Sequence, residues 1–171
     1  MLASLADAPL QDPELVYEPK YDGIRAIADV PARGRVRLWS RLGNEKTTQF
    51  PEVAAALEEW ARRRKVPAVV DGEIVALDEK GRPVGFQNLQ GRIHLKKGPG
   101  DSDGLSIAYI AFDLLADNGK DLRELPLVDR RAALERVFAS SESPMLRVSE
   151  QVRGDGQALN TRDVGSRTEG P

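Results

Sequence analysis

Residues 20–30 read KYDGIRAIADV, and this stretch joins a tight turn to a strand. Asp22-Gly23 is a dipeptide typical of turns, and Pro19 disfavours helix in the residue before it. From Ile24 to Val30, small and apolar residues alternate with a mixed set, which is the two-residue period of a strand with one buried face. The sequence therefore predicts that Lys20 lies where an extended segment meets a turn.

The same patterns predict further elements along the chain. Prolines open two helices, one at Pro51 and one at Pro126, and a short helical turn is expected at 86–90. Alternating or continuous apolar runs predict strands at 16–20, 36–42, 68–77, 105–115 and 146–152. Strands mostly joined by hairpins, with two helices between them, indicate an α+β domain with antiparallel sheets flanked by helices.

Composition bounds the functions that this chain can have. Its 171 residues are 40% hydrophobic and 30% charged, which is typical of one folded domain in water. The absence of cysteine excludes disulfides and thiolate metal sites, and a single histidine, His94, leaves little for zinc. No apolar run approaches the roughly 20 residues of a membrane helix, and the N-terminus lacks the features of a signal peptide. We expect a cytoplasmic protein with no membrane partner.

Two short polar segments stand out against these elements. Asp71-Gly72-Glu73 interrupts an apolar strand, where a purely structural strand would avoid such residues. In the 36–42 strand, Val36, Leu38, Ser40 and Leu42 are expected on one face, and the other face carries Arg35, Arg37, Trp39 and Arg41. That basic face is consistent either with contacts to a DNA backbone or with solvated arginines.

Lys20 has neighbours suited to nucleophilic chemistry. A lysine amine has an ordinary pKa of about 10.4, so it needs nearby positive charge or burial to react at neutral pH. Arg25 supplies charge, Tyr17 and Ile24 supply an apolar wall, and Asp22 is placed to orient the amine or a magnesium ion. Taken alone, a K-x-D-G sequence is more simply an exposed lysine in a turn.

The order of motifs decides between these interpretations. Lys20-Tyr21-Asp22-Gly23-Ile24-Arg25 resembles motif I of the covalent nucleotidyltransferases, which include ATP-dependent DNA ligases, RNA ligases and mRNA capping enzymes. Ser40-Arg41-x-Gly43, Asp71-Gly72-Glu73-Ile74-Val75 and Ala111-Phe112-Asp113-Leu114-Leu115 resemble the motifs that follow, in the same order. The match is strongest to the ligase module of bacterial end-joining ligases.

This resemblance implies a covalent nucleotidyltransferase fold, ATP-grasp-like, and a three-step reaction. Lys20 would attack the α-phosphate of ATP, AMP would pass to a DNA 5'-phosphate, and a 3'-hydroxyl would displace AMP and seal the nick. ATP and Mg²⁺ are the implied cofactors. Nicked or broken duplex DNA is the implied partner, together with end-joining proteins or a complementary C-terminal ligase fragment.

The resemblance also assigns roles to individual residues. Lys20 is the implied catalytic nucleophile, with Asp22 and Glu169 associated with the metal. Nucleotide contacts are implied for a set drawn from four motifs: Glu18, Tyr21, Arg25, Arg41, Glu73 and Phe112. Of these, Phe112 is the residue that would stack on adenine, although a phenylalanine in an apolar strand is usually part of a core.

The C-terminal segment departs from the family pattern. The chain is expected to comprise an adenylation domain at 1–152 and a divergent or truncated tail at 153–171, without the OB-fold domain and the lysines of the later motifs. Glu169-Gly170 matches the start of the next motif. Two alternatives stay open from sequence: a non-catalytic or split-enzyme fragment that binds ATP or DNA, and an RNA ligase or capping-type enzyme.

Overall fold

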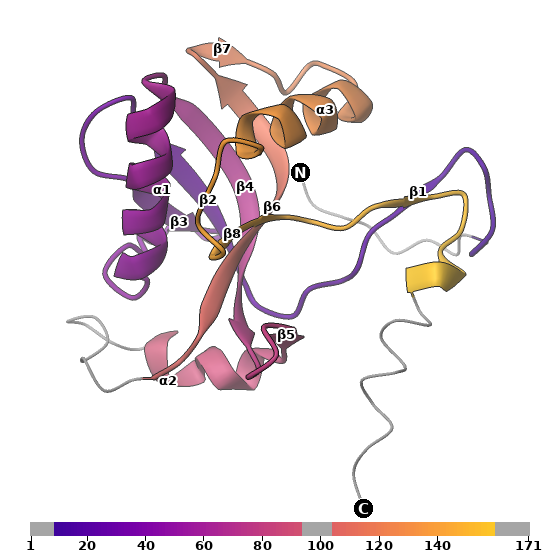
Figure 1. Ribbon diagram of the computed structural model, residues 1–171, viewed down its shortest axis with the longest axis horizontal. Coiled ribbons are helices and arrows are strands. Elements are labelled where there is room, and N and C mark those ends of the chain that lie inside the picture. Colours follow the sequence, from indigo (N-terminus) through magenta and orange to yellow (C-terminus); the bar gives the residue numbers. More distant parts are fainter. Residues whose placement is uncertain (1–8, 94–103, 160–171) are drawn as a thin grey trace, which may run out of the picture. The chain divides into compact units, whose positions relative to one another are not determined.

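The computed structural model describes residues 9–93 and 104–159 (Figure 1). Contacts divide the chain into two compact units, one made of 1–20 with 149–171 and the other of 21–148. Each unit is described by itself. In the described residues no helix has the length and apolar character needed to cross a membrane.

The larger unit is built on a seven-stranded sheet. Its main path runs β3-β2-β4-β6-β7, while β5 pairs with β4 and β8 pairs with β6. The pairs are antiparallel except that between β6 and β8. The strands are β2 (Ile24–Val30), β3 (Arg37–Ser40), β4 (Ala68–Leu77), β5 (Pro83–Val84), β6 (Ile107–Asp117), β7 (Lys120–Asp121) and β8 (Leu146–Val148). The predicted α+β class with antiparallel pairing is confirmed.

Two longer helices, α1 (Pro51–Arg64) and α3 (Leu127–Phe138), pack with the sheet, and η1 (Phe86–Leu89) and α2 (Gln90–Ile93) follow β5. Pro51 starts α1, as predicted, because its fixed φ suits the first helical position. Trp60 of α1 joins the two helices: its ring centroid lies 4.8 Å from that of Phe138, and its Nε1–H donates to the Val137 carbonyl at 3.1 Å.

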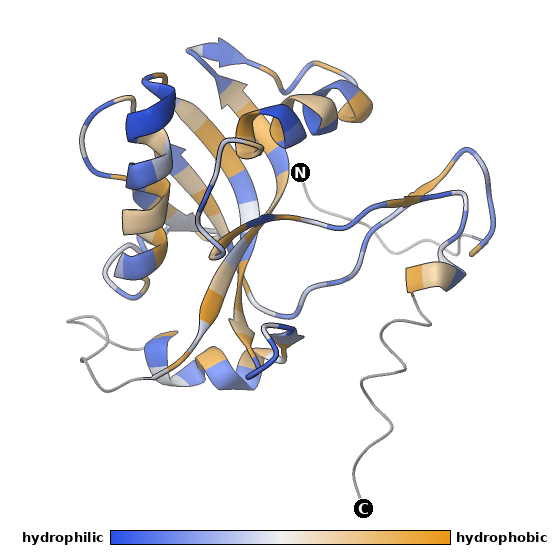
Figure 2. Ribbon diagram, viewed as in Figure 1, coloured by the Kyte–Doolittle hydropathy of each residue, from blue (hydrophilic) through white to orange (hydrophobic). Residues whose placement is uncertain are grey.

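One face of the sheet carries the main core. Residues that alternate along β2, β4 and β6 are buried with α1 and α3, as in Ala26, Ala28, Val70, Ile74 and Tyr109. In Figure 2 these strands are coloured mostly toward the hydrophobic end. The residues between them point to the opposite face, which is described as the site face below because Arg25, Asp71 and Glu73 lie there.

The smaller unit pairs β1 (Val16–Tyr17) with β9 (Val152–Arg153) in antiparallel register. The Tyr17 hydroxyl donates to the Pro9 carbonyl at 2.5 Å. Gly156 lies against the Tyr17 ring so closely that a Cβ there would approach Cδ1 to 2.6 Å, so a side chain would displace the ring.

Three details of the strand prediction are corrected. The first strand covers Val16–Tyr17 rather than 16–20, and the stretch predicted as one strand at 146–152 is divided between β8 and β9, which belong to different units. Leu42 is 84% exposed instead of facing the core. The cause is a turn after Ser40, where the Gly43 N–H donates to the Ser40 carbonyl at 2.8 Å with φ of 75° at Gly43.

Candidate functional site

A bidentate ion pair lies at the centre of the site face. Arg25 on β2 donates from Nε to Asp71 Oδ1 at 3.0 Å and from Nη2 to Oδ2 at 2.5 Å. The Asp71 side chain on β4 is 5% exposed, so its charge needs this partner. The hydrogen bond that Arg25 donates to Asp71 is the main reason that the pKa of Arg25 is raised. The bidentate pair with Asp71 thus fixes the position of the Arg25 guanidinium.

Glu73 lies beside this pair, because β2 and β4 place Arg25 directly opposite it. Burial raises the pKa of Glu73 from 4.5 to about 7, and the Gly23 N–H, which hydrogen-bonds to the carboxylate, opposes the shift together with Arg25. Gly23 itself is packed against β4: a Cβ there would lie 2.2 Å from the Ile74 carbonyl oxygen. The turn after Lys20 therefore requires glycine, and it supplies a donor to Glu73.

Phe112 occupies an irregularity in the sheet. Asp71 is opposite Asp113 and Gly72 is opposite Ala111, so Phe112 is an extra residue on β6. Such a bulge redirects a side chain and is common beside active sites. The Phe112 ring centroid lies 5.7 Å from Cζ of Arg25, and among the described residues Phe112 is outside the buried core clusters. The interpretation of Phe112 as an ordinary core residue is therefore wrong.

The position of Gly72, between Asp71 and Glu73, requires glycine because other atoms pack closely against it. A Cβ at this position would lie 2.6 Å from Cζ of Tyr109 and 2.7 Å from the Ile110 carbonyl oxygen. Tyr109 is fully buried, its hydroxyl lies 3.0 Å from the carbonyl oxygens of Ala26 and Val70, and burial raises its pKa well above 10. Sequence reasoning missed Tyr109, although a glycine inside a buried strand signals a close neighbour.

A second buried ion pair fixes the residue next to Phe112. Arg130 of α3 donates to Asp113 from Nε at 2.8 Å and from Nη2 at 2.9 Å, and from Nη1 to the Leu125 carbonyl at 2.7 Å. Both residues are 8% exposed. Arg130 is therefore not a solvated surface residue. Neither is Arg64, which pairs with Asp117 and whose Cζ lies 4.5 Å from the centroid of the Trp60 ring.

The residues predicted to bind metal do not form a site by themselves. Asp22 Oδ2 accepts the Phe86 N–H at 3.1 Å, and Glu169 lies outside the described residues. Across 9–93 and 104–159, no group of three His, Cys, Asp or Glu side chains gathers as metal ligands would. This donor set fits Mg²⁺ only as an ion that takes further oxygens from a nucleotide or water, as Mg²⁺ commonly does.

The other residues predicted to contact the nucleotide differ in burial and in their neighbours. Tyr21 packs with the small apolar cluster of Val75, Ala108 and Ile110, which lies on the site face. Arg41 is exposed in the turn after β3. The larger unit thus brings Tyr21, Arg25, Glu73 and Phe112 to one face.

Glu18 and Lys20 belong to the smaller unit. Glu18 Oε1 accepts hydrogen bonds from Ser149 Oγ at 3.0 Å and from Gln151 Nε2 at 2.9 Å, so it ties the two segments of that unit together. Lys20 is joined by its peptide bond to Tyr21, the first residue of the larger unit.

Comparison with known proteins assigns the chain to a family. The family model described as ATP dependent DNA ligase domain matches residues 1–168. This chain belongs to the ATP-dependent DNA ligase domain family. The predicted resemblance is confirmed, including the similarity to the ligase module of bacterial end-joining ligases. The multifunctional non-homologous end joining protein LigD of Pseudomonas aeruginosa is 37% identical over 158 residues, which are 92% of this ligase-domain chain and 17% of that protein.

Other relatives agree in sequence and in fold. A DNA ligase of Natronomonas pharaonis is 36% identical over 129 residues, or 75% of this chain and 23% of that protein. The crystal structure of the ligase domain from M. tuberculosis LigD matches with a TM-score of 0.68 and 30% identity, over 88% of this chain and 45% of that one.

A mycobacterial DNA ligase D complexed with ATP and MES gives a TM-score of 0.68 and 32% identity, over 88% of this chain and 44% of that one. The covalent nucleotidyltransferase fold predicted for the ligase domain is thereby confirmed. The chain spans less than a quarter of the two full-length relatives and less than half of the two solved chains.

Proposed function

We propose that this chain is the adenylation module of an ATP-dependent DNA ligase, with Lys20 as the residue that carries AMP. The observation that carries the proposal is the cluster of Arg25, Asp71, Glu73 and Phe112 on one face of the sheet. This cluster occurs in a chain that the ligase-domain family model matches over residues 1–168. The complex of mycobacterial DNA ligase D with ATP supports ATP as the nucleotide.

The proposed chemistry is phosphoryl transfer in three steps. The Lys20 Nζ forms a bond to the α-phosphorus of ATP as the bond to the pyrophosphate oxygen breaks, and the amine loses its proton. An oxygen of a DNA 5'-phosphate then displaces the lysine, and a DNA 3'-hydroxyl finally displaces AMP. Such steps depend on positioning and on neutralising phosphate charge more than on covalent assistance.

The site face supports the nucleoside roles. A half-buried Glu73 carboxylate suits a ribose hydroxyl, because a buried acceptor gains most from a donor. Phe112 follows Ala108 and Ile110 on the site face and offers a ring for adenine to stack on, and Arg25 is held beside that ring by Asp71. Tyr21 would contribute an apolar wall.

The remaining roles complete the proposal. Glu18 would lie along the adenine edge, and the exposed Arg41 would meet phosphate oxygens. Mg²⁺, when bound, would neutralise the triphosphate and favour pyrophosphate departure. Asp22 is the described residue proposed to contact that ion, and Glu169 is the second proposed contact.

The proposed substrate is nicked or broken duplex DNA in a cytoplasmic repair reaction, with end-joining proteins as partners. The family assignment and the end-joining names of two relatives, LigD of Pseudomonas aeruginosa and LigD of Bacillus subtilis, support it. Adenylation of this chain and sealing of DNA are separable steps, so the first is the direct test.

The test is labelling with ATP that carries radioactive phosphorus at the α-position, in the presence of Mg²⁺. We expect covalent label on the wild-type chain, loss of all label in Lys20→Ala, and normal labelling in the matched control Lys120→Ala, which removes an exposed lysine of β7. Label that persists in Lys20→Ala, or wild-type protein that stays unlabelled, would contradict the assignment of an active adenylation module.

A second candidate function is binding of ATP or DNA without adenylation, as by one piece of a longer or split enzyme. The cluster of Arg25, Glu73 and Phe112 on the site face could bind a nucleoside whether or not Lys20 reacts, so it supports this candidate as well. Calorimetry that detects ATP binding in the absence of label would support this candidate, and labelling restored by a supplied C-terminal ligase fragment would identify a split enzyme. GTP that competes better than ATP would instead indicate a capping-type enzyme.

A further inference from the structure

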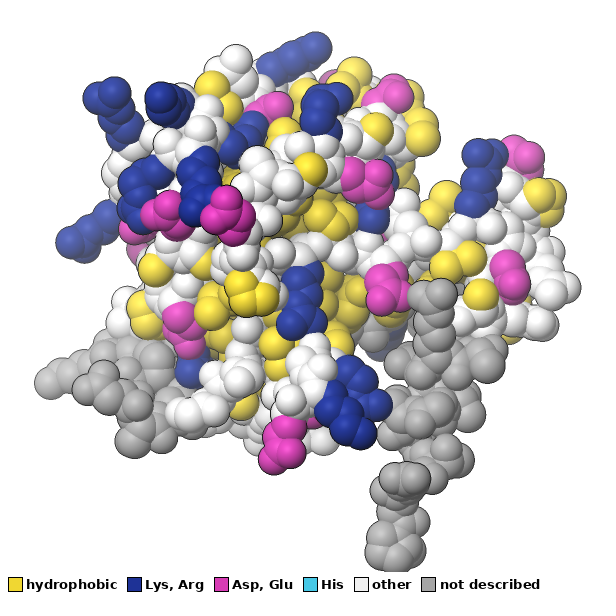
Figure 3. All heavy atoms as spheres, viewed as in Figure 1, with side chains coloured by type: hydrophobic (Ala, Val, Ile, Leu, Met, Phe, Trp, Pro, Cys, Tyr) yellow, Lys and Arg dark blue, Asp and Glu magenta, His cyan; other side chains and the backbone are white. Residues whose placement is uncertain are grey.

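The arginines of the larger unit differ in what their guanidinium groups contact. At the end of α1, Arg62 and Arg63 pair with Glu59, and Arg64 pairs with Asp117. In Figure 3 basic and acidic side chains are interspersed over α1. Arginines elsewhere in the unit are also paired with carboxylates, as in Arg82–Asp78, Arg92–Glu52, Arg123–Asp121, Arg130–Asp113 and Arg131–Glu135. Their positive charge is largely neutralised within the protein.

The segment that leads into and follows β3 is different. Arg33, Arg35 and Arg41 make no hydrogen bond or ion pair with any residue in the described ranges, and all three are exposed. Arg37 has a loose pair with the exposed Asp29, at 3.8 Å, and its Cζ lies 5.9 Å from the centroid of the Trp39 ring. Arg136 of α3 is also exposed without such a partner for its side chain in the described residues, as are Lys65, Lys80 and Lys120, but among the arginines only this segment groups several of them.

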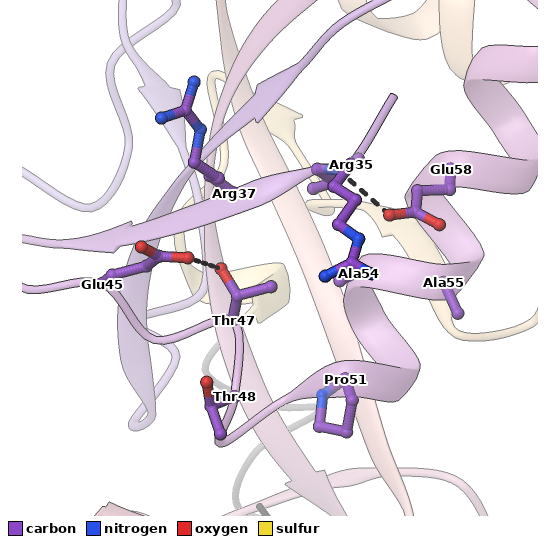
Figure 4. A pocket seen from close by; sticks show the side chains of 10 residues that line it. Arg35, Arg37, Glu45, Thr47, Thr48, Pro51, Ala54, Ala55 and Glu58 are labelled. Atoms are coloured by element: carbon purple, nitrogen blue, oxygen red, sulfur yellow. Dashed lines mark hydrogen bonds between the residues drawn. The ribbon is translucent and has the colours of Figure 1, made fainter. Parts of the chain in front are cut away.

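A hollow of about 640 Å³ lies beside Arg35 and Arg37 (Figure 4). Arg35 extends toward Ala54 of α1, and Arg37 points outward from β3. The rest of the lining comes from the 45–48 loop and the first turns of α1: Val36, Glu45, Thr47, Thr48, Pro51, Ala54, Ala55 and Glu58. The two arginines thus border a recess rather than a flat surface.

The two carboxylates in this lining are occupied by the protein. Glu58 Oε1 accepts the Val36 N–H at 3.1 Å, and Glu45 Oε1 accepts the Thr47 hydroxyl at 2.9 Å. The Thr47 oxygen in turn accepts the Leu38 N–H at 3.0 Å. These bonds fix the walls and connect the carboxylates to backbone and hydroxyl donors, whereas the guanidinium of Arg35 has no such partner in the described part of the chain.

We propose that the edge formed by Arg35 and Arg37, with the hollow beside it, is a contact surface for the phosphate backbone of duplex DNA, separate from the nucleotide cluster. The proposal rests on the proposed function for its partner, since it names where the DNA is held. Guanidinium groups match phosphate oxygens in geometry and charge. Arg35 lies two residues before Arg37, which begins β3, so both guanidinium groups are presented from the same edge of the sheet.

Contacts of this kind have a defined signature. Each neutralised phosphate releases counterions, so binding weakens as salt rises, with a slope of about −0.9 in log K against log [salt] per contact on duplex DNA. Because phosphates carry no sequence information, the surface would hold DNA in place without a preference for sequence. The surface would therefore position a duplex for end joining at any sequence.

The experiment compares two double variants of the full chain. Arg35→Gln/Arg37→Gln removes the proposed surface, and Arg62→Gln/Arg63→Gln removes the same charge from arginines paired with Glu59. Binding to a fluorescein-labelled nicked duplex is followed by anisotropy from about 50 to about 200 mM salt. We expect the first variant to lose about 2 in slope and roughly tenfold or more in affinity at about 100 mM salt, and the control to retain the wild-type slope.

Three outcomes would overturn the proposal: an unchanged slope in Arg35→Gln/Arg37→Gln, an equal loss in both variants, or no salt-dependent DNA binding by the wild type. An equal loss would point to net charge rather than to this surface. Labelling of Lys20 from ATP involves no DNA and is measured in the same wild-type sample. Failure of labelling with the slopes as expected would remove the proposed adenylation and leave the DNA surface, and the converse result would do the opposite.

Discussion

The two faces of the central sheet are formed by the same strands but differ in their side chains: one face is apolar and buried, and the other carries charged groups. On the face toward α1 and α3, β2 and β4 present Ala26, Ala28, Val70 and Ile74, each without exposed surface. On the site face the residues between them include Arg25, Asp71 and Glu73. Stability is expected from the first face, through burial of apolar area, and ligand chemistry from the second.

The comparison shows how a sheet tolerates charge beside a core. Asp71 is 3% exposed, yet it takes two hydrogen bonds from Arg25, and Glu73 takes one from the Gly23 N–H. Buried polar groups are costly unless they have such partners. The polar face is therefore a network whose members depend on one another, whereas apolar contacts on the other face are closer to additive.

The largest effect is expected on the core face, from Trp60→Ala. This change removes the ring that packs on Phe138 and the hydrogen bond to the Val137 carbonyl, so the free energy of unfolding should fall by about 3–5 kcal/mol. Urea unfolding measures it. The matched control is Trp39→Ala, at a half-buried edge position, which should cost less than half as much. Equal losses at the two tryptophans would show that the helix layer is not the main core.

A smaller but still large effect is expected on the site face, from Asp71→Asn. Removing the carboxylate leaves the Arg25 guanidinium without its charged partner. Because the Arg25 side chain is 29% exposed and can be partly hydrated, we expect the free energy of unfolding to fall by only about 2 kcal/mol. The control Asp29→Asn changes a carboxylate that is 46% exposed and should stay within about 0.5 kcal/mol.

A double-mutant cycle makes that comparison sharper. If the site face is a network, Arg25→Gln combined with Asp71→Asn should cost less than the sum of the single changes, by about 1–2 kcal/mol. Additive losses in urea unfolding would mean that the pair contributes nothing beyond its separate packing contacts.

The elements on both faces were predictable from local sequence. The strand at 68–77 has the bounds of β4, and the prolines at 51 and 126 mark the starts of α1 and α3. These features follow from side-chain period and from the fixed φ of proline, which act over a few residues. The inward stripe of α1, with Val53, Leu57, Trp60 and Ala61 buried, follows from the same period.

The partners across the sheet were not predictable in this way. Arg25 and Asp71 are 46 residues apart, and Asp113 and Arg130 are 17 apart, so their pairing depends on register between strands and helices. Alternation with Ala108 and Ile110 places Phe112 on the site face, but period alone predicts no bulge, and the bulge sets Asp113 opposite Asp71. The motif order indicated which residues matter, while the pairs of charges that hold them required the fold.

The smallest effect is expected from Glu73→Gln and depends on pH. Because the folded state raises the pKa of Glu73 from 4.5 to about 7, the native protein retains a proton that the unfolded chain has already released between these values. Wild-type stability therefore falls as pH rises through this window, and the penalty is complete above pH 7. Glutamine mimics the protonated acid, so the variant should gain on the wild type by about 1 kcal/mol at alkaline pH and by nearly nothing near pH 4.5.

Urea unfolding at several pH values measures this gain, with Glu79→Gln, on an exposed turn, as the control. A gain that is the same at every pH would show that Glu73 does not titrate with folding. The variant also separates the two faces most directly. If the carboxylate accepts a hydrogen bond from a ribose hydroxyl, Glu73→Gln should raise the ATP concentration needed for half-maximal labelling while it raises the free energy of unfolding. No substitution on the core face is expected to combine these two effects.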